Sequence, residues 1–383
     1  MAISNFARNQ ISSFKEQDII SFTENPSGLN IKLYPAQRFM LKLFEKMPLD
    51  DTEHNIPVYD KFLTTQLHLF TEKEYYEFLL NENRVSLPYE EYCNSMQTQF
   101  QLVMGRRGTK TTTIAIFVCY KLYQLLLHKQ PQLMFNILEN NPMNITMVSL
   151  GQDNANKLFG KFNDIISNSK FFKPYLLEEA TGNSLKIWTQ NDIEKLQGRR
   201  PGTHSNSITV TASPNSPGVR GDDNIFVIMD ELAHFMSSPN SIKDKQEDAA
   251  IYSALTPSVA AFTLKGTTIP YGKTFIFSSP NGKRGKFYEE YVKAYELGTE
   301  SGNFVMVAPT WETNPNVGAF FLKTEYNKDP ASFNVEFGAQ FDDSTSSWFE
   351  DKSTLYSSFI ATKEPTPDFG IPTVQYFLGA DFG

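Results

Sequence analysis

The chain has 383 residues, enough for one large domain or two ordinary ones, and its hydrophobic content of 40% supports a sizeable core and excludes wholesale disorder. The net charge of -8 argues against a protein that coats nucleic acid with a broad basic face, but leaves room for a local DNA-contacting loop. The two cysteines give no disulfide framework or metal spacing, and the chain has neither a signal core nor an uncharged apolar run of about 18 residues, so we expect a soluble intracellular protein.

The N-terminal part of the chain predicts an arm, a helix start and an insertion. Residues 1–28 are polar and end in the turn-like ENPSG, so we expect an arm or docking segment. The segment YPAQ then opens an amphipathic helix, and its Gln37 carries an amide that matches the edge of adenine because it both donates and accepts. A surface helical glutamine is the alternative. Residues 47–96 are rich in acids and aromatics with a helical pattern, which predicts a helical insertion.

The stretch FQLVMGRRGTKTTTIAIFVCYKLYQLLL, residues 100–127, predicts an apolar strand, a glycine-bearing turn and a long apolar helix. Such a turn binds a triphosphate when glycines let the backbone approach, a lysine reaches the outer phosphates, a hydroxyl binds Mg²⁺ and the helix N-terminus faces the charge. The residues that fill these roles are Gly105, Gly108, Lys110 and Thr111.

The turn departs from the usual spacing GxxxxGK[ST], because Met104 and Thr109 stand where that pattern has its two glycines. A strand-to-helix turn with solvated arginines, Arg106 and Arg107, is therefore the alternative. Further along, Ile145–Leu150 and the helical pattern after it form a second βα unit, which predicts a mainly parallel sheet.

Residues 171–210 add two short strands joined by a basic loop. Two interpretations of Arg199 and Arg200 in that loop are open: they contact DNA phosphates or a neighbouring subunit, or they are simply solvated. A proline- and glycine-rich loop follows and contains Arg220. An arginine on a loop beside the sheet can reach a γ-phosphate bound by the next subunit, so Arg220 is a candidate arginine finger, in competition with Arg106 and Arg107 of the turn.

The segment IFVIMDE, Ile225–Glu231, predicts a buried strand with two acids at its carboxyl end, where open α/β sheets bind their ligands. Asp230 would hold Mg²⁺ through water, and Glu231 would polarise the attacking water. Two solvated acids that cap a strand are the alternative. Thr274–Phe277 predicts another strand, and the paired hydroxyls after it, Ser278 and Ser279, can sense a γ-phosphate or simply open a Ser-Pro turn.

The C-terminal part predicts one more strand with helices over residues 303–358 and a linker with three prolines over residues 361–373. Residues 374–383 then read as a strand that ends in Asp381 with no partner. Because a lone strand is unstable, we expect the chain to be a fragment or its parent to be interrupted there.

In this order the motifs resemble the large terminase subunit of tailed bacteriophages, the ATPase that drives genome packaging. The family's phosphate loop, GRRxGKT, is similar to residues 105–111, with Thr109 in place of its second glycine. The other similar segments are Tyr34–Gln37 for the adenine motif, Arg220 and Gly221 for the arginine–glycine loop, Ile225–Glu231 for Walker B, and Ser278–Pro280 for the coupling motif.

The resemblance covers about residues 30–360 and implies an α/β fold: a RecA-like P-loop ATPase domain over residues 29–360, followed by the truncated start of an RNase H-like nuclease domain. It implies that Glu231 is catalytic with Arg220 or Arg106, that Thr111 and Asp230 hold Mg²⁺, and that Ser278 and Ser279 couple hydrolysis to movement. The implied nucleotide-binding residues are Gln37, Gly105, Arg106, Arg107, Gly108, Thr109, Lys110 and Thr111. Asp381 would be one ligand of an incomplete nuclease metal site, so we expect this chain not to cut DNA by itself.

The function that the resemblance implies is an ATP- and Mg²⁺-dependent motor that packages viral double-stranded DNA, with a metal-dependent endonuclease in the parent protein. The implied partners are double-stranded DNA, the portal protein and procapsid, the small terminase subunit and further copies in a ring, in the host cytoplasm and away from membranes. A superfamily 2 helicase-like ATPase is disfavoured because residues 303–358 are too short for a second RecA-like domain. A nucleotide-gated scaffold without turnover is disfavoured by Glu231.

Overall fold

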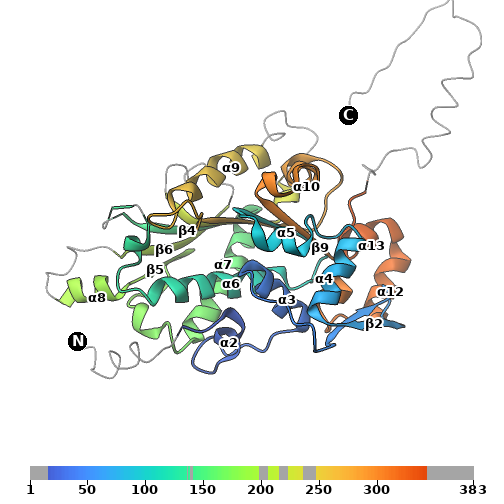
Figure 1. Ribbon diagram of the computed structural model, residues 1–383, viewed down its shortest axis with the longest axis horizontal. Helices are drawn as coiled ribbons and strands as arrows, with labels where there is room; N and C mark the ends of the chain where they lie inside the picture. The colour runs from blue at the N-terminus through green and yellow to red at the C-terminus, as the bar shows by residue number, and fades with distance from the viewer. Residues whose placement is uncertain are drawn as a thin grey trace, which may run out of the picture.

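The computed structural model describes residues 16–135, 137–138, 141–197, 206–214, 223–235 and 247–342. Its centre is a seven-stranded sheet with the strand order β5-β6-β4-β7-β8-β3-β9 (Figure 1). Neighbouring strands run parallel, except that the edge strand β5 is antiparallel to β6. The strands are β3 (Gln99–Met104), β4 (Met143–Ser149), β5 (Ser184–Ile187), β6 (Ile208–Pro214), β7 (Asn224–Asp230), β8 (Lys273–Ser278) and β9 (Asn303–Ala308). The predicted α/β fold with a mainly parallel sheet is confirmed.

Helices cover both faces of the sheet (Figure 1). One face is covered by α6 (Lys110–Leu126) and α7 (Gly151–Asn168), with α2 (Ile19–Glu24) and α3 (Pro35–Phe44) packed on α6, and the other by α9 (Glu247–Leu255) and α10 (Gly285–Leu297). The remaining helices are α4 (Glu72–Asn81), α5 (Tyr89–Asn94), α8 (Gln190–Gln197), α11 (Thr310–Thr313), α12 (Ala319–Lys328) and α13 (Pro330–Glu336). Among the described residues, no helix combines the length and apolar character that a bilayer crossing requires.

The central strands are apolar on both sides because successive residues point to opposite faces. In β3, Phe100 and Leu102 join the core under α6, whereas Val103 joins the core under α9 and α10. Every residue of β7 is buried, as expected for a parallel strand with helices on both faces. Helix α6 is apolar on most of its circumference because it lies between the sheet and α2, α3 and α7.

Residues 1–28 were predicted to form an arm or docking segment, and the described part of this segment departs from an arm. Residues 19–24 form α2, which Asp18 caps by accepting hydrogen bonds from the backbone N–H groups of Ile20 and Ser21. Phe22 is fully buried and stacks on Tyr123 of α6 with ring centroids 4.0 Å apart. The arm prediction is therefore wrong from Ile19 onward, because a short apolar run inside a polar segment packs into the core.

The predicted helical insertion over residues 47–96 also contains a β-hairpin. Strands β1 (Ile56–Tyr59) and β2 (Gln66–Phe70) pair antiparallel before α4 and α5. The helical prediction is therefore wrong for residues 56–70, since runs of four or five residues are too short for periodicity to separate strand from helix. The insertion then lies along the edge strand β9, where Val85 pairs antiparallel with Met306.

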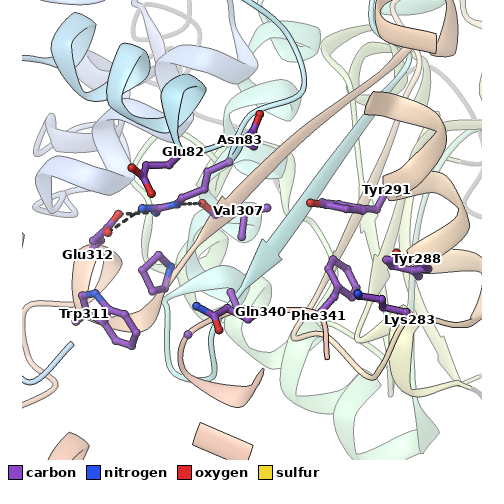
Figure 2. Close-up of a pocket in the computed structure, with 14 residues that line it drawn as sticks. Glu82, Asn83, Lys283, Tyr288, Tyr291, Val307, Trp311, Glu312, Gln340 and Phe341 are labelled. Atoms are coloured by element: carbon purple, nitrogen blue, oxygen red, sulfur yellow. Dashed lines mark hydrogen bonds and ion pairs between the residues drawn. The ribbon is translucent and has the colours of Figure 1, made fainter. Parts of the chain in front are cut away.

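A buried ion pair fastens this insertion to α11. The guanidinium group of Arg84 donates to both carboxylate oxygens of Glu312 at 2.9 and 2.6 Å and to the carbonyl oxygen of Val307 at 3.1 Å (Figure 2). The Tyr75 hydroxyl donates to the same carboxylate at 2.6 Å. The Glu312 side chain is only 4% exposed, so its charge depends on these donors for compensation.

We expect Arg84→Ala to lower the free energy of unfolding by about 3 to 5 kcal/mol, because the buried carboxylate of Glu312 loses its counter-charge. Urea denaturation measures this loss. Arg38→Ala is the matched control, since the Arg38–Glu24 pair is 40% and 32% exposed and is expected to contribute less than about 1 kcal/mol. Equal losses in the two variants would contradict the assignment.

Candidate active site

The turn between β3 and α6 has a backbone path that depends on two close approaches and two unusual conformations. A Cβ atom on Gly105 would lie 2.3 Å from Thr310 Oγ1 and 2.4 Å from the carbonyl oxygen of Phe337, so only glycine fits there. Arg107 and Thr109 both have left-handed backbone angles, with φ of 62° and 66°. These angles explain how the turn closes although Thr109 replaces a glycine of the usual pattern.

Thr109 itself is strained, because a β-branched residue is disfavoured in the left-handed region and its Oγ1 is buried without a hydrogen-bond partner in the described part of the chain. We expect Thr109→Gly to raise the free energy of unfolding by about 1 kcal/mol. Thermal or urea denaturation of the nucleotide-free protein measures the change, with Thr112→Gly as a control for glycine in the first turn of the helix. A loss of stability in Thr109→Gly would show that the turn does not carry this strain.

The turn presents free backbone donors at the start of α6. Within the described ranges, the backbone N–H groups of Thr109, Lys110 and Thr111 have no hydrogen-bond partner. A helix N-terminus preceded by residues in left-handed conformations directs such groups toward a common point and favours an anion there. The geometry of this turn is that of a phosphate-binding loop.

The ends of three strands meet beside this turn. The ammonium group of Lys110 lies 3.0 Å from Glu231 Oε1. Glu231 Oε2 accepts hydrogen bonds from the Ser278 hydroxyl at 3.0 Å and from the Ser279 backbone N–H at 3.2 Å. Because β8 lies between β7 and β3, its carboxyl end joins the lysine turn to the acidic end of β7. The structure thus brings together the lysine, the double acid and the serine pair.

The two acids differ in their surroundings. Burial and the neighbouring charge of Glu231 raise the pKa of Asp230 to about 7, against the opposing effect of Lys110. Burial acts to raise the pKa of Glu231 as well, but the ammonium group of Lys110 outweighs it and the pKa lies below its usual value. Glu231 is therefore the ionised partner of the lysine, and its backbone has a left-handed φ of 56°.

Asp230 has unused capacity for a ligand. Its Oδ1 is buried with no hydrogen-bond partner in the described residues, and its Oδ2 lies 3.5 Å from the Ser149 hydroxyl at the end of β4. Thr111 and Asp230 both line one cavity, which is described below. Mg²⁺ bound to a nucleotide needs only one or two protein ligands besides phosphate and water, so Asp230 and Thr111 fit this ion. In the described residues, no group of three His, Cys, Asp or Glu side chains is arranged to hold a metal ion by itself.

A cavity of about 400 Å³ opens over these groups. Its lining residues come from the turn, from α7 and from the ends of β7 and β8: Arg106, Thr111, Leu150, Asn154, Lys157, Leu158, Asp230, Glu231, His234 and Ser279. Sequence reasoning missed Ser149, Asn154 and Lys157. Their signal was the second βα unit, since the carboxyl end of β4 lies at the same edge of the sheet as that of β7.

His234 packs against the acidic end of β7. Its Nε2 lies 3.0 Å from the Ser279 hydroxyl and 3.8 Å from Glu231 Oε2. Burial lowers the pKa of this imidazole, although the charge of Glu231 opposes the shift. The side chain therefore contributes a neutral hydrogen-bonding partner to the serine pair.

Other predicted site residues lie apart from the cavity. Gln37 is buried, accepts from the Tyr34 backbone N–H at 3.1 Å and donates to Thr113 Oγ1 at 3.4 Å, so both ends of its amide contact the protein. The Arg107 guanidinium lies 4.9 Å from the ring centroid of Phe321 and does not line the cavity. The predicted residues outside the described ranges are Arg199, Arg200, Arg220, Gly221 and Asp381.

Two further cavities lie nearby. One of about 260 Å³ is lined by Tyr34, Tyr59 and Trp311 and reaches Thr313, whose hydroxyl would lie 3.0 Å from a Cβ atom on Gly108. A larger one, about 600 Å³, lies at the carboxyl end of β9, where Trp311, Tyr288, Tyr291 and Phe341 surround it (Figure 2). The larger cavity shares no lining residue with the cavity over the strand ends.

Among solved structures, the chain is similar to the large terminase ATPase domain of Thermus phage P74-26, with a TM-score of 0.46 and 16% identity over 65% of this chain and 90% of that domain. It is also similar to the large terminase of bacteriophage HK97, with a TM-score of 0.49 and 13% identity over 85% of this chain and 55% of that protein. These values assign no function. No curated protein matches the chain. The family model described as "Uncharacterized protein MJ0330, N-terminal P-loop domain" matches residues 1–338, and the chain therefore belongs to this family of P-loop domains.

Proposed function

We propose that the chain is a Mg²⁺-dependent ATPase that drives the movement of double-stranded DNA during viral genome packaging. The observation that supports the ATPase most strongly is the 3.0 Å contact between Lys110 and Glu231, which joins the phosphate loop to the acidic end of β7. The serine pair at the end of β8 contacts the same carboxylate. A single bound triphosphate would therefore touch all three strand ends.

In this proposal the turn binds the triphosphate through the backbone N–H groups of Thr109, Lys110 and Thr111, and the Lys110 ammonium reaches the outer phosphates. The remaining residues of the turn, Gly105, Arg106, Arg107 and Gly108, shape this loop. Thr111 and Asp230 would hold Mg²⁺, which would neutralise charge on the phosphates. The free Oδ1 of Asp230 supports its part in this site.

Glu231 acts as the general base in the proposal. Without nucleotide, the Lys110 ammonium neutralises its carboxylate. When phosphate oxygens compete for that ammonium, the carboxylate becomes available to accept a proton from the attacking water. Ser278 and Ser279 hold the same carboxylate, so a change in its position on hydrolysis would pass to the loop after β8.

The adenine base is assigned to the cavity of about 260 Å³ beside Tyr34, whose aromatic walls suit a flat base. Gln37 does not line this cavity, so in the proposal it recognises the base only after its amide gives up the long 3.4 Å contact with Thr113. Arg106 is the cationic residue of the turn that lines the cavity over the strand ends, and its guanidinium group pairs with the Glu336 carboxylate at 3.2 Å. Arg220 of a neighbouring copy is the alternative arginine finger and implies a ring of subunits.

The motor function rests on the ordered set of motifs that resembles large terminases. In this proposal the partners are double-stranded DNA, the portal protein and procapsid, the small terminase subunit and further copies of the chain, in the host cytoplasm. The parent protein would also carry a metal-dependent endonuclease to which Asp381 contributes. Contacts that move DNA grip its backbone, so DNA binding is expected to be independent of sequence and sensitive to salt.

Phosphate release from ATP by the purified chain tests the ATPase. We expect hydrolysis that requires Mg²⁺, stops when EDTA removes the ion and returns when Mg²⁺ is restored. Thr111 is neutral and Asp230 is an acid, so neither can replace the positive charge that the ion supplies to the phosphates. Stimulation by double-stranded DNA of any sequence would support the motor. Tight ATP binding without turnover would instead indicate a nucleotide-gated scaffold, and the absence of ATP binding would refute the proposal.

A further inference from the structure

We propose that residues 310–314, which comprise α11 and the asparagine after it, form a clamp that holds the phosphate loop in its nucleotide-binding conformation. The inference rests on the ATP site proposed above and assigns a positioning role to Thr310 and Asn314. Neither residue lines the cavity over the strand ends. They act through hydrogen bonds to the backbone of the loop.

The clamp binds the carbonyl groups of the loop. The Thr310 hydroxyl donates to the carbonyl oxygen of Arg106 at 2.7 Å, and the Asn314 amide donates to the carbonyl oxygen of Arg107 at 2.7 Å. Thr310 is fully buried. Two consecutive carbonyl groups of the loop thus have short hydrogen bonds to one five-residue segment that lies about two hundred positions further along the chain.

These two hydrogen bonds decide which side of the loop faces an anion. A phosphate is bound by N–H groups, and a peptide that turned over would present its carbonyl oxygen to the phosphate instead. Arg107 and Thr109 have left-handed backbone angles without being glycine, so the loop has little intrinsic preference for this path. Because Thr310 and Asn314 hold the Arg106 and Arg107 carbonyl oxygens, these oxygens are not free to turn toward a phosphate, and the N–H groups of residues 109–111 remain for the nucleotide.

The clamp is itself held at three places. Glu312 is fixed by Arg84 and by Tyr75, and Figure 2 shows the paired hydrogen bonds from the guanidinium group to this carboxylate. The Thr310 backbone N–H donates to the carbonyl oxygen of Phe337 at 2.9 Å. A four-residue helix has almost no stability of its own, so these contacts make it a rigid support.

The test compares two substitutions at one position. Thr310→Val removes the hydroxyl while keeping the shape, and Thr310→Ser keeps the hydroxyl. We expect Thr310→Val to raise the Kd for a fluorescent ATP analogue about tenfold, because the part-buried carbonyl oxygen of Arg106 loses its donor, and Thr310→Ser to change it by less than about threefold. Asn314→Ala is expected to weaken binding in the same direction, and the maximal rate at saturating ATP should change less than the Kd.

A second measurement separates positioning from general loss of stability. In a Thr109→Gly background the loop adopts its left-handed turn at lower cost, so Thr310→Val should then raise the Kd by only about threefold. A role confined to stability would lower the unfolding free energy of Thr310→Val and leave the Kd of the folded protein unchanged in both backgrounds. Unchanged ATP affinity in Thr310→Val and Asn314→Ala, beside a parent that binds ATP, would overturn the clamp and leave the ATP site standing. A parent that binds no ATP would refute the proposed function, and the clamp with it.

Discussion

Glu231→Gln is expected to lower the rate of ATP hydrolysis about 10³-fold while ATP stays bound, because the amide keeps the shape of the side chain but cannot accept a proton from water. Glu231 Oε2 accepts hydrogen bonds from Ser278 and Ser279, and the amide oxygen can accept them in its place. The variant should therefore fold and bind. Phosphate release under saturating ATP measures the loss, and equilibrium binding of a fluorescent analogue measures what is retained.

The same substitution is expected to leave ATP affinity unchanged or to increase it. In the parent, the carboxylate of Glu231 competes with phosphate for the Lys110 ammonium. An uncharged amide removes this competition, so the Kd should not rise. Glu289→Gln on the exposed side of α10 is the control, since Glu289 is 59% exposed and lies on a different helix from the site. Parent-like hydrolysis by Glu231→Gln would exclude Glu231 as the base.

Lys110→Ala is expected to weaken ATP binding about 100-fold and to reduce hydrolysis to background, because the phosphates lose their charge-assisted donor from the loop. Its side chain is only 7% exposed, so water cannot fully replace the missing ammonium group. Titration with a fluorescent ATP analogue measures the change. Lys129→Ala is the control, since that lysine is 57% exposed and pairs with Glu194 away from the cavity. A Kd within about twofold of the parent's would contradict the role of Lys110.

The stability of Lys110→Ala should depend on pH in a defined direction. Lys110 holds the pKa of the partly buried Glu231 below its usual value. A carboxylate with a depressed pKa in the folded state adds stability above its unfolded pKa and loses it as the pH falls through the folded value. The difference in unfolding free energy between parent and variant should therefore be largest near neutral pH and shrink below about pH 4.

The sequence predicted the parts of the site that local patterns encode. Each strand of the site is an apolar run that ends in polar residues, as in Ile225–Glu231, and parallel strands place their carboxyl ends at one edge. This argument was enough to expect Lys110 and the double acid at the same place. The helix start at YPAQ was also predicted, but not the burial of Gln37, whose amide oxygen accepts from the Tyr34 backbone N–H.

The remaining features depend on contacts between distant residues. No local pattern places β8 between β7 and β3, because strand order follows from how the crossovers pack. The hydrogen bonds from Thr310 and Asn314 to the phosphate loop join segments with no sequence relation. The hairpin β1–β2 was missed because its strands are short and β2 is mostly exposed. The burial of the β2 residues therefore shows no clear alternation.

The most direct test is a crystal structure of the chain with a non-hydrolysable ATP analogue and Mn²⁺, in which anomalous scattering locates the ion. The account predicts one ion between the Thr111 hydroxyl and the Asp230 carboxylate, with the outer phosphates on Lys110 and the ion bound to Asp230 directly or through one water. An ion or triphosphate bound elsewhere, with Lys110 and Asp230 both out of its reach, would contradict the central claim that these strand ends form one ATP site.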